Sequence, residues 1–262
     1  MIRSLSTAGT GMMAQQTNLD TISNNLANVN TTAYKQQRAE FQDMMYQTLV
    51  APGAPTGANT RQPIGMQVGL GSMFSASATN FDQGSLQNTG NPLDLAVNGD
   101  GFFQVQMPDG TTGYTRDGSF KTDATGLVVT SEGYAIEPNI TIPTGVTSLS
   151  ISPSGLVSAS VPGQNEPQDL GQITLAKFVN PSGLRRLGQN LYEANSASGD
   201  PQVVNPGEEG AGVLQAGFLE GSNVQIVEEM VRMILAQRAY EINSKAIQTA
   251  DDMLQVLNAL KR

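Results

Sequence analysis

Catalytic chemistry in this chain would have to rest on carboxylates, lysines, tyrosines and serines. The 262 residues contain no histidine, no cysteine and no tryptophan. The chain therefore lacks the imidazole base, the thiolate nucleophile and the usual nitrogen and sulfur metal ligands. A serine nucleophile would need a basic neighbour, but no Ser-x-x-Lys occurs, and Ala124 follows Asp123 where an aspartic protease has Thr-Gly. The sequence predicts no enzyme, no cofactor and no metal.

Three turn-like segments carry the residues that could bind an ion. The segments 98–101 and 123–126 combine Asn or Asp with Gly, but their spacing does not match an EF-hand loop and no closing bidentate Glu follows. Asn and Asp also tolerate left-handed backbone and bond their own turns, so we interpret both segments as turns. The segment 207–212 is rich in Gly but acidic, which would repel phosphate, and it is interpreted as a hinge.

The net charge of −9 lies in the middle of the chain. Residues 1–45 hold three basic and three acidic side chains, and residues 222–262 hold five of each. An acidic middle without a basic stripe argues against nucleic acid or anionic lipid as a partner. The start has no apolar run of the length of a secretory signal, and no stretch approaches a membrane span of about 20 residues. We expect no membrane insertion and, if the protein leaves the cytoplasm, a route without a cleaved signal.

The C-terminal segment has the strongest helical periodicity. Gly is absent after Gly221, Ser222 and Gln225 have capping-box spacing, and Glu228 and Glu229 lie where the helix dipole favours acids. The apolar side chains predicted to form one stripe are Val224, Val227, Val231, Leu235, Ile242, Ala246, Ala250, Met253, Leu257 and Leu260, and the periodicity is weak near Arg238. A single helix cannot bury such a stripe by itself.

A second amphipathic helix is predicted at the N-terminus and offers a partner. Its apolar positions are Ile2, Leu5, Met12, Leu19, Ile22, Leu26 and Val29. Gly9 and Gly11 weaken its first turns, and the segment 24–30 suits a helix end. We expect the two terminal helices to pair as a coiled coil. Their far faces keep Met230, Met233, Ile234 and Tyr240, so the sequence favours assembly with neighbouring copies over a monomer in which the helices contact only each other.

The middle of the chain predicts an antiparallel β domain. Short alternating runs at 93–97, 101–107, 127–130, 149–151 and 173–176 are separated by turn dipeptides such as Asn98-Gly99 and Asp117-Gly118. The predicted fold class is therefore α+β. Its domains are a discontinuous coiled-coil assembly domain at 1–45 plus 222–262, an extended linker or arm at 46–72 with a return linker at 205–221, and a β-rich outer domain at 73–204.

Four sequence blocks, in order along essentially the whole chain, resemble the bacterial flagellar rod and hook axial protein family. They read NLANVNTTAYK at 25–35, NPLDLAVNGDGFF at 91–103 with YTRDGSF at 114–120, LEGSNV at 219–224, and EEM at 228–230 with QRAYEINSK at 237–245. The family commonly has Gly-Phe where Ala33-Tyr34 stands. The motif residues are Asn25, Asn28, Asn30, Lys35, Asp94, Gly99, Gly101, Phe102, Phe103, Tyr114, Arg116, Gly118, Ser222, Asn223, Glu229, Gln237, Arg238, Tyr240, Glu241, Asn243, Ser244 and Lys245.

The resemblance implies a structural subunit of the flagellar basal body that polymerises into a hollow helical tube. In its length and in the run 237–245 the chain is most similar to distal rod proteins. A hook protein is usually longer, and a proximal rod protein shares most of the motifs. The resemblance also implies export by the flagellar type III apparatus, contacts with other rod, hook and ring proteins, and an arm at 46–72 that stiffens the tube. A monomeric β-rich binding module is the alternative of another class; it would need an aromatic platform, and the chain has six Tyr and no Trp.

Overall fold

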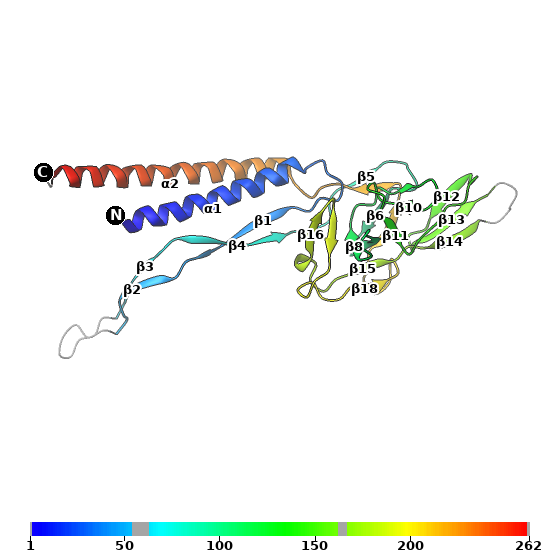
Figure 1. Cartoon of the computed structure of the whole chain (residues 1–262), viewed down its shortest axis with the longest axis horizontal. Coiled ribbons are helices and arrows are strands. Elements are labelled where there is room, and N and C mark those ends of the chain that lie inside the picture. Colours follow the sequence, from blue (N-terminus) through cyan, green and yellow to red (C-terminus); the bar gives the residue numbers. More distant parts are fainter. Residues whose placement is uncertain (1, 54–62, 162–166, 261–262) are drawn as a thin grey trace. The chain divides into compact units, whose positions relative to one another are not determined.

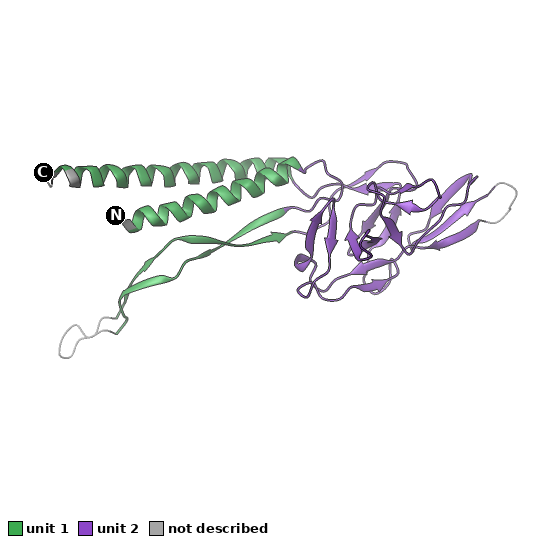
Figure 2. Ribbon diagram, viewed as in Figure 1, with its two compact units in different colours: residues 1–27, 37–79, 225–262 green, residues 28–36, 80–224 purple. Residues whose placement is uncertain are grey.

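The computed structural model describes residues 2–53, 63–161 and 167–260 and has an α+β fold (Figure 1). The chain divides into two compact units (Figure 2). Unit 1 comprises residues 1–27, 37–79 and 225–262, and unit 2 comprises residues 28–36 and 80–224. The predicted fold class is confirmed, because two terminal helices pack together and the central region is an antiparallel β structure.

Two long helices and a β-ribbon form unit 1. Helix α1 spans Ile2–Ala27 and helix α2 spans Ile226–Leu260. Helix α1 contacts α2 and also strands β1 and β4 of the ribbon. The helix runs through Gly9 and Gly11, which were expected to weaken its first turns, and it ends before the Asn-rich turn at 28–30. Among the described residues, neither helix is long and apolar enough to cross a membrane.

The ribbon consists of two successive strand pairs. Strand β1 (Gln37–Asp43) pairs with β4 (Ser72–Thr79), and β2 (Tyr46–Val50) pairs with β3 (Met66–Gly69), all antiparallel. The register of the first pair shifts between Glu40 and Phe41, and that of the second between Thr48 and Val50. The segment expected to be an arm at 46–72 therefore lies in a paired ribbon, and its residues 54–62 are outside the described residues.

Strands connected by tight turns build unit 2. They are β5 (Leu86–Asn88), β6 (Leu95–Asn98), β7 (Phe102–Gln106), β8 (Thr112–Thr115), β9 (Lys121–Thr122), β10 (Val128–Val129), β11 (Ala135–Glu137), β12 (Ser148–Ile151), β13 (Leu156–Ser160), β14 (Gln168–Gln172), β15 (Leu175–Lys177), β16 (Arg185–Gly188), β17 (Leu191–Glu193), β18 (Gln202–Val204), β19 (Val213–Ala216) and β20 (Phe218–Glu220), with a short 3₁₀ helix at Pro181–Gly183. Each of the five predicted runs overlaps one of these strands.

The main sheet of unit 2 has the order β16-β17-β8-β7-β11-β10-β9, and β15 pairs with both β7 and β18. Strands β12, β13 and β14 form a separate meander, while β19 pairs with β6 and β20 pairs with β5. The predicted return linker at 205–221 thus contains two strands that pair back onto the middle of the chain. The acidic segment expected to be a hinge is a compact turn, in which the Gly207 amide donates to the Gly212 carbonyl at 3.0 Å.

Two apolar clusters stabilise unit 2. The larger contains Leu95, Val97, Phe103, Phe120, Val128, Ile136, Ile140, Val157, Ile173, Leu175 and Leu214. The smaller is aromatic and contains Phe102, Tyr114, Ala176, Phe178, Leu184 and Tyr192. Phe103 and Phe120 meet edge to face with ring centroids 5.1 Å apart, a geometry that aromatic pairs prefer.

Candidate assembly surface and buried polar networks

Small and polar side chains of α2 face α1. Glu229, Ala236 and Ala250 are almost fully buried, and Asn243 and Ile247 are half-buried. These residues recur at intervals of three, four or seven, which keeps them on one side of a helix. A Cβ added at Gly11 of α1 would lie 3.0 Å from the Asn243 Nδ2 atom, so the backbone of α1 lies close to the Asn243 side chain at this point. The helices therefore pack through small residues.

The apolar side chains of α2 form a separate outer stripe, defined as Val227, Val231, Ile234, Leu235 and Ile242. Their side chains are between 52% and 75% exposed. In the middle of the stripe Arg238 donates to Glu241 at 2.8 Å in an exposed ion pair, where the sequence showed a weak spot. The outer stripe is thus a large apolar surface that the described chain leaves uncovered, which is typical of a protein interaction site.

The structure differs here from the expected helix pairing. The predicted stripe advances mostly by four residues, and each such step turns about 40° around a helix. Along the chain it rotates from the outer face at Val227 to the buried face at Ala250. Ala246 and Met253 are exposed, and Val224 is buried just before α2 begins. Met233, expected on the far face, is half-buried, and Tyr240 is 40% exposed.

The predicted apolar residues of α1 are covered to different extents. Ile22 is buried, Met12, Leu19 and Leu26 are half-buried, Leu5 is 37% exposed, and Val29 lies in the turn that follows the helix. The side chains of Ile2, Leu257 and Leu260 lie outside the described residues. The role of all these residues in self-assembly stays a prediction.

Asn25 links three segments of unit 1. Its Oδ1 accepts from the Gln37 amide at 2.9 Å and its Nδ2 donates to the Gln37 carbonyl at 2.8 Å, so the side chain pairs with the backbone as a neighbouring strand would. The Nδ2 atom also donates to Glu229 Oε2 at 3.3 Å. Glu229 in turn accepts from Arg232 at 3.0 Å. Asn25 and Glu229 are almost fully buried, so this motif pair fixes the end of α1, the start of β1 and the first turns of α2.

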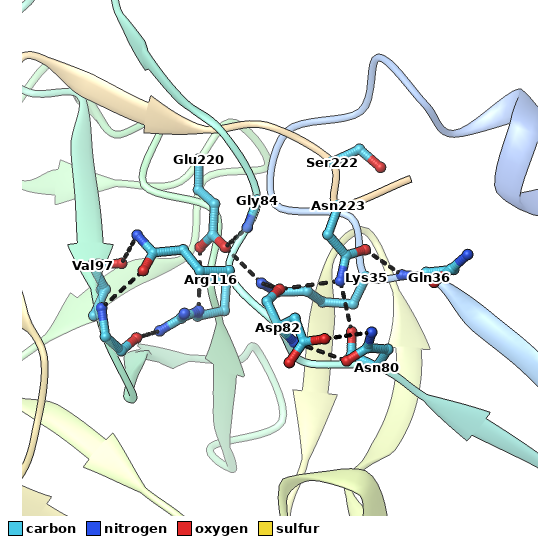
Figure 3. A network of polar contacts seen from close by, with 12 residues as sticks. Lys35, Gln36, Asn80, Asp82, Gly84, Val97, Arg116, Glu220, Ser222 and Asn223 are labelled. Atoms are coloured by element: carbon cyan, nitrogen blue, oxygen red, sulfur yellow. Dashed lines mark hydrogen bonds and ion pairs between the residues drawn. The ribbon is translucent and has the colours of Figure 1, made fainter. Parts of the chain in front are cut away.

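A buried charge network in unit 2 contains Lys35, Arg116 and Glu220 (Figure 3). Lys35 Nζ lies 2.6 Å from Glu220 Oε1 and donates to the Asp82 carbonyl at 2.8 Å. Arg116 Nε lies 3.2 Å from Glu220 Oε2, and its NH1 donates to the carbonyls of Gly99 and Gly101 at 2.8 and 2.6 Å. The side chains of Lys35 and Glu220 are completely buried, and that of Arg116 is 4% exposed.

Burial dominates the electrostatics of this network. It lowers the pKa of Lys35, and the attraction of Glu220 only partly offsets this effect. Burial also lowers the pKa of Arg116, again against the attraction of Glu220. A buried pair of charges contributes little net stability, but removing one member leaves the other uncompensated and costs about 3–5 kcal/mol. The network therefore specifies one arrangement of the segments that it joins.

Hydrogen bonds between side chains and backbone groups extend the network around residues 31–36 and 220–224. Asn223 Oδ1 accepts from the Gln36 amide at 2.7 Å, and Asn223 Nδ2 donates to the carbonyls of Asn80 and Asp82 at 3.0 and 3.1 Å (Figure 3). Ser222 Oγ accepts from the Val224 amide at 3.2 Å. The motif residues near the two ends of the chain thus meet in one place.

Arg186 of β16 also contacts this network. It donates to the Lys35 carbonyl at 2.6 Å, and its guanidinium lies 5.5 Å from the Tyr34 ring and 5.8 Å from the Tyr192 ring. Sequence reasoning missed Arg186 as a site residue and did not single out Glu220 within its motif. The sequence did not indicate that Lys35 would be fully buried. The available signal for a charge network was that Lys35 and Arg116 stand in separate motifs of a chain with a net negative charge.

The motif glycines and aromatics shape the β structure. Gly99 and Gly101 have φ of 113° and 142°, a region open to glycine, and their carbonyls point to Arg116. A side chain at Gly118 would collide with the Leu95 carbonyl. Phe103 lies in the larger cluster, whereas Phe102 and Tyr114 lie in the aromatic one. Asp94 accepts from Asn91 Nδ2 at 3.0 Å.

The remaining motif residues lie on helix surfaces or in turns. Gln237, Arg238, Glu241 and Lys245 are exposed on α2, and Ser244 is half-buried. Asn28 Oδ1 accepts from Thr31 Oγ1 at 3.2 Å, and Asn30 is exposed. Asp123 accepts from the next amide at 2.6 Å, as expected of a turn residue. No group of three or more acidic side chains that could hold a metal ion occurs in the part of the chain that the structure describes.

Comparisons with known proteins match three parts of the chain to one class of protein. Three family models match: the flagella basal body rod protein at residues 5–35, the D1 domain of the flagellar hook protein FlgE/F/G at 96–159, and the flagellar basal body rod FlgEFG protein C-terminal region at 215–260. The matched ranges include Lys35, Arg116 and Glu220 of the charge network. These matches define the class as rod and hook axial proteins of the bacterial flagellum.

Full-length relatives narrow the class. The chain is 52% identical to the flagellar basal-body rod protein FlgG of Borreliella burgdorferi, with all of both chains covered. It is 50% identical to FlgG of Buchnera aphidicola subsp. Acyrthosiphon pisum, covering 99% of this chain and 100% of the relative, and 44% identical to FlgG of Bacillus subtilis with both chains fully covered. The chain belongs to the family of the flagellar basal-body rod protein FlgG. It is a structural subunit of the flagellar basal body and not an enzyme.

Proposed function

We propose that copies of this chain polymerise through the outer stripe of α2 into a hollow helical tube that forms the distal rod. The carrying observation is the exposure of Val227, Val231, Ile234, Leu235 and Ile242 on the side of α2 away from α1. Burying one aliphatic side chain of this kind contributes about 1.5–3 kcal/mol. Neighbouring copies that cover several of them would stabilise a polymer of many subunits.

The charge distribution supports placing the helices at the inner wall of this tube. The terminal segments 1–45 and 222–262 carry equal numbers of acidic and basic side chains, whereas the acidic excess lies between them. Neutral helices can pack densely around a channel without mutual repulsion. Acidic β domains are better tolerated at a larger radius, where subunits are further apart and salt screens their charges.

In this proposal the tube transmits torque from the motor to the hook and conducts exported subunits. Its partners are further copies of the chain, the neighbouring rod and hook proteins, the surrounding rings and the flagellar type III export apparatus. The paired terminal helices act as a coiled coil in the assembled state. The ribbon at 37–79 stiffens the tube, which would separate a straight rod from a flexible hook.

Electron microscopy and sedimentation of the purified chain at increasing concentration test the proposal. The full-length chain is expected to form straight tubes, and the Leu235→Asp variant is expected to remain monomeric because a charge cannot be buried at the contact. The matched control is Gln16→Asp, which adds the same charge at an exposed position of α1. Tubes formed equally well by Leu235→Asp would refute assembly through the outer stripe.

A further inference from the structure

Unit 1 contains a second apolar surface, a groove between α1 and the ribbon. The groove has a volume of about 300 Å³ and its lining contains no charged residue. Its main apolar residues are Met13, Ala14, Met44, Met73 and Phe74. Met13 is 71% exposed, Met73 45% and Phe74 41%, so these side chains are open to solvent in the single chain. We call this surface the α1–ribbon groove.

Local backbone geometry brings the ribbon against α1. Gly71 has a φ of 116°, and a Cβ at this position would collide with Thr10 Oγ1, so only glycine allows the ribbon to come this close. The Met44 amide donates to the Gly71 carbonyl at 2.8 Å and holds the two strands together beside the groove. The backbone of the ribbon and of α1 therefore forms the groove, which does not depend on the rotamers of a few side chains.

We propose that the α1–ribbon groove binds the outer stripe of a second copy of this chain, with Val231, Ile234 and Leu235 as the inserted side chains. This inference rests on the proposed assembly through the outer stripe and names the surface that receives it. The groove lining contains no charged residue and the three inserted side chains are aliphatic, so they enter the groove without desolvating a charge. The Arg238–Glu241 ion pair lies further along α2, beyond the inserted residues.

The dimensions of the two surfaces agree. The groove follows α1 from Thr10 to Thr17, about 10 Å along the helix axis, and the three stripe residues occupy about 6 Å of α2. The unbranched methionine side chains of the groove can adapt to the branched side chains of the stripe. A chain cannot fill its own groove with its own stripe, because the stripe lies on the side of α2 opposite to the α1 contact.

The pairing of two different surfaces determines the kind of assembly. A contact in which one surface meets its own copy closes into a dimer and stops. A contact between a stripe and a groove leaves a free stripe at one end and a free groove at the other, so further copies can add. Such a contact forms a ring if the rotation between copies closes and an open helical array with a direction if it does not, and the proposed tube is the open case.

Disulfide trapping tests this contact directly, because the natural chain has no cysteine. The Met13→Cys/Leu235→Cys double variant is oxidised after assembly and analysed on a non-reducing gel. A ladder of linked multimers is expected, since each chain then carries one cysteine in the groove and one on the stripe. The matched control is Gln16→Cys/Leu235→Cys, which moves the first cysteine to an exposed position of α1 outside the groove lining.

Sedimentation of the same samples under reducing conditions separates the two hypotheses. Polymers without a ladder, an equal ladder from the Gln16 control, or dimers from Leu235→Cys alone would overturn the stripe-to-groove contact while leaving assembly through the stripe in place. The last of these would show that the stripe meets another stripe. A chain that stays monomeric at every concentration would overturn the proposed assembly and this contact with it.

Discussion

The two units bury opposite kinds of side chain. Unit 2 encloses large apolar residues such as Phe103 and Phe120 and even the charges of Lys35 and Glu220. Unit 1 buries Ala, Asn and a glutamate between its helices and exposes most of its Val, Ile and Met. The hydrophobic core of unit 2 is complete within one chain, whereas many apolar residues of unit 1, such as Val227 and Leu235, are exposed. Apolar content alone therefore does not indicate where a protein is stable by itself.

The largest loss of stability is expected from Glu220→Leu. This change leaves the buried Lys35 and Arg116 without their shared carboxylate, and the free energy of unfolding should fall by about 5 kcal/mol. Urea unfolding followed by circular dichroism measures the effect. The control is Glu193→Leu, whose partner Arg185 is exposed, and it should cost at most about 1 kcal/mol. Equal losses in both variants would contradict the role given to the network.

Phe103→Ala should be the next most severe change. Phe103 is fully buried against Phe120, and truncation would cost about 4 kcal/mol through lost burial and a residual cavity. Phe41→Ala in the ribbon, where the side chain is 39% exposed, serves as the comparison and should cost much less. Thermal unfolding measures the loss of stability in the two variants. Equal losses would mean that the two units have cores of the same kind.

Asn25→Ala is expected to have an intermediate effect within unit 1. The change removes the hydrogen bonds to the Gln37 backbone and to Glu229 and should cost about 2 kcal/mol. Hydrogen exchange should show faster opening at the end of α1 and the start of β1. Ser23→Ala, two residues earlier and exposed, is the control. Unchanged protection in Asn25→Ala would mean that the side chain does not hold this junction.

Leu235→Asp should have the smallest effect on stability and the clearest effect on assembly. Leu235 is 64% exposed, so its replacement should change the unfolding free energy by less than about 0.5 kcal/mol. The next residue, Ala236, is 3% exposed, and Ala236→Leu should cost about 1–3 kcal/mol through overpacking. The reverse order of stabilities in denaturant titrations would show that the stripe faces α1 in solution.

Local sequence patterns predicted the helices and the β character of the middle well. Helical periodicity and turn dipeptides act over a few residues, and each predicted strand run overlaps a strand. The ribbon was not predicted, because its pairing joins residues as distant as Gln37 and Thr79, and nothing local distinguishes it from an extended linker. By contrast, α1 ends at Ala27, within the segment 24–30 that the sequence indicated as a helix end.

The orientation of α2 and the burial of Lys35 were beyond the sequence for related reasons. Periodicity identifies an apolar face but not what covers it, and here the small residues Gly11 and Ala236 fill the helix contact. Lys35, Arg116 and Glu220 lie in three separate motifs, and only the fold brings them together. The motifs located the right segments, whereas the chemistry that they share depends on tertiary pairing.

Gly11 affects one dimension of the inferred polymer, the spacing between α1 and α2. Gly11 has a hydrogen where other residues have a Cβ atom, and this allows α1 to lie close to the Asn243 side chain of α2. If the groove on α1 and the stripe on α2 join successive copies, that spacing enters the repeat distance of the filament at every subunit. A methyl group at Gly11 would lie 3.0 Å from Asn243 Nδ2, so the Asn243 side chain or the helix would have to shift, and any change in helix spacing would recur at every subunit of the inferred polymer.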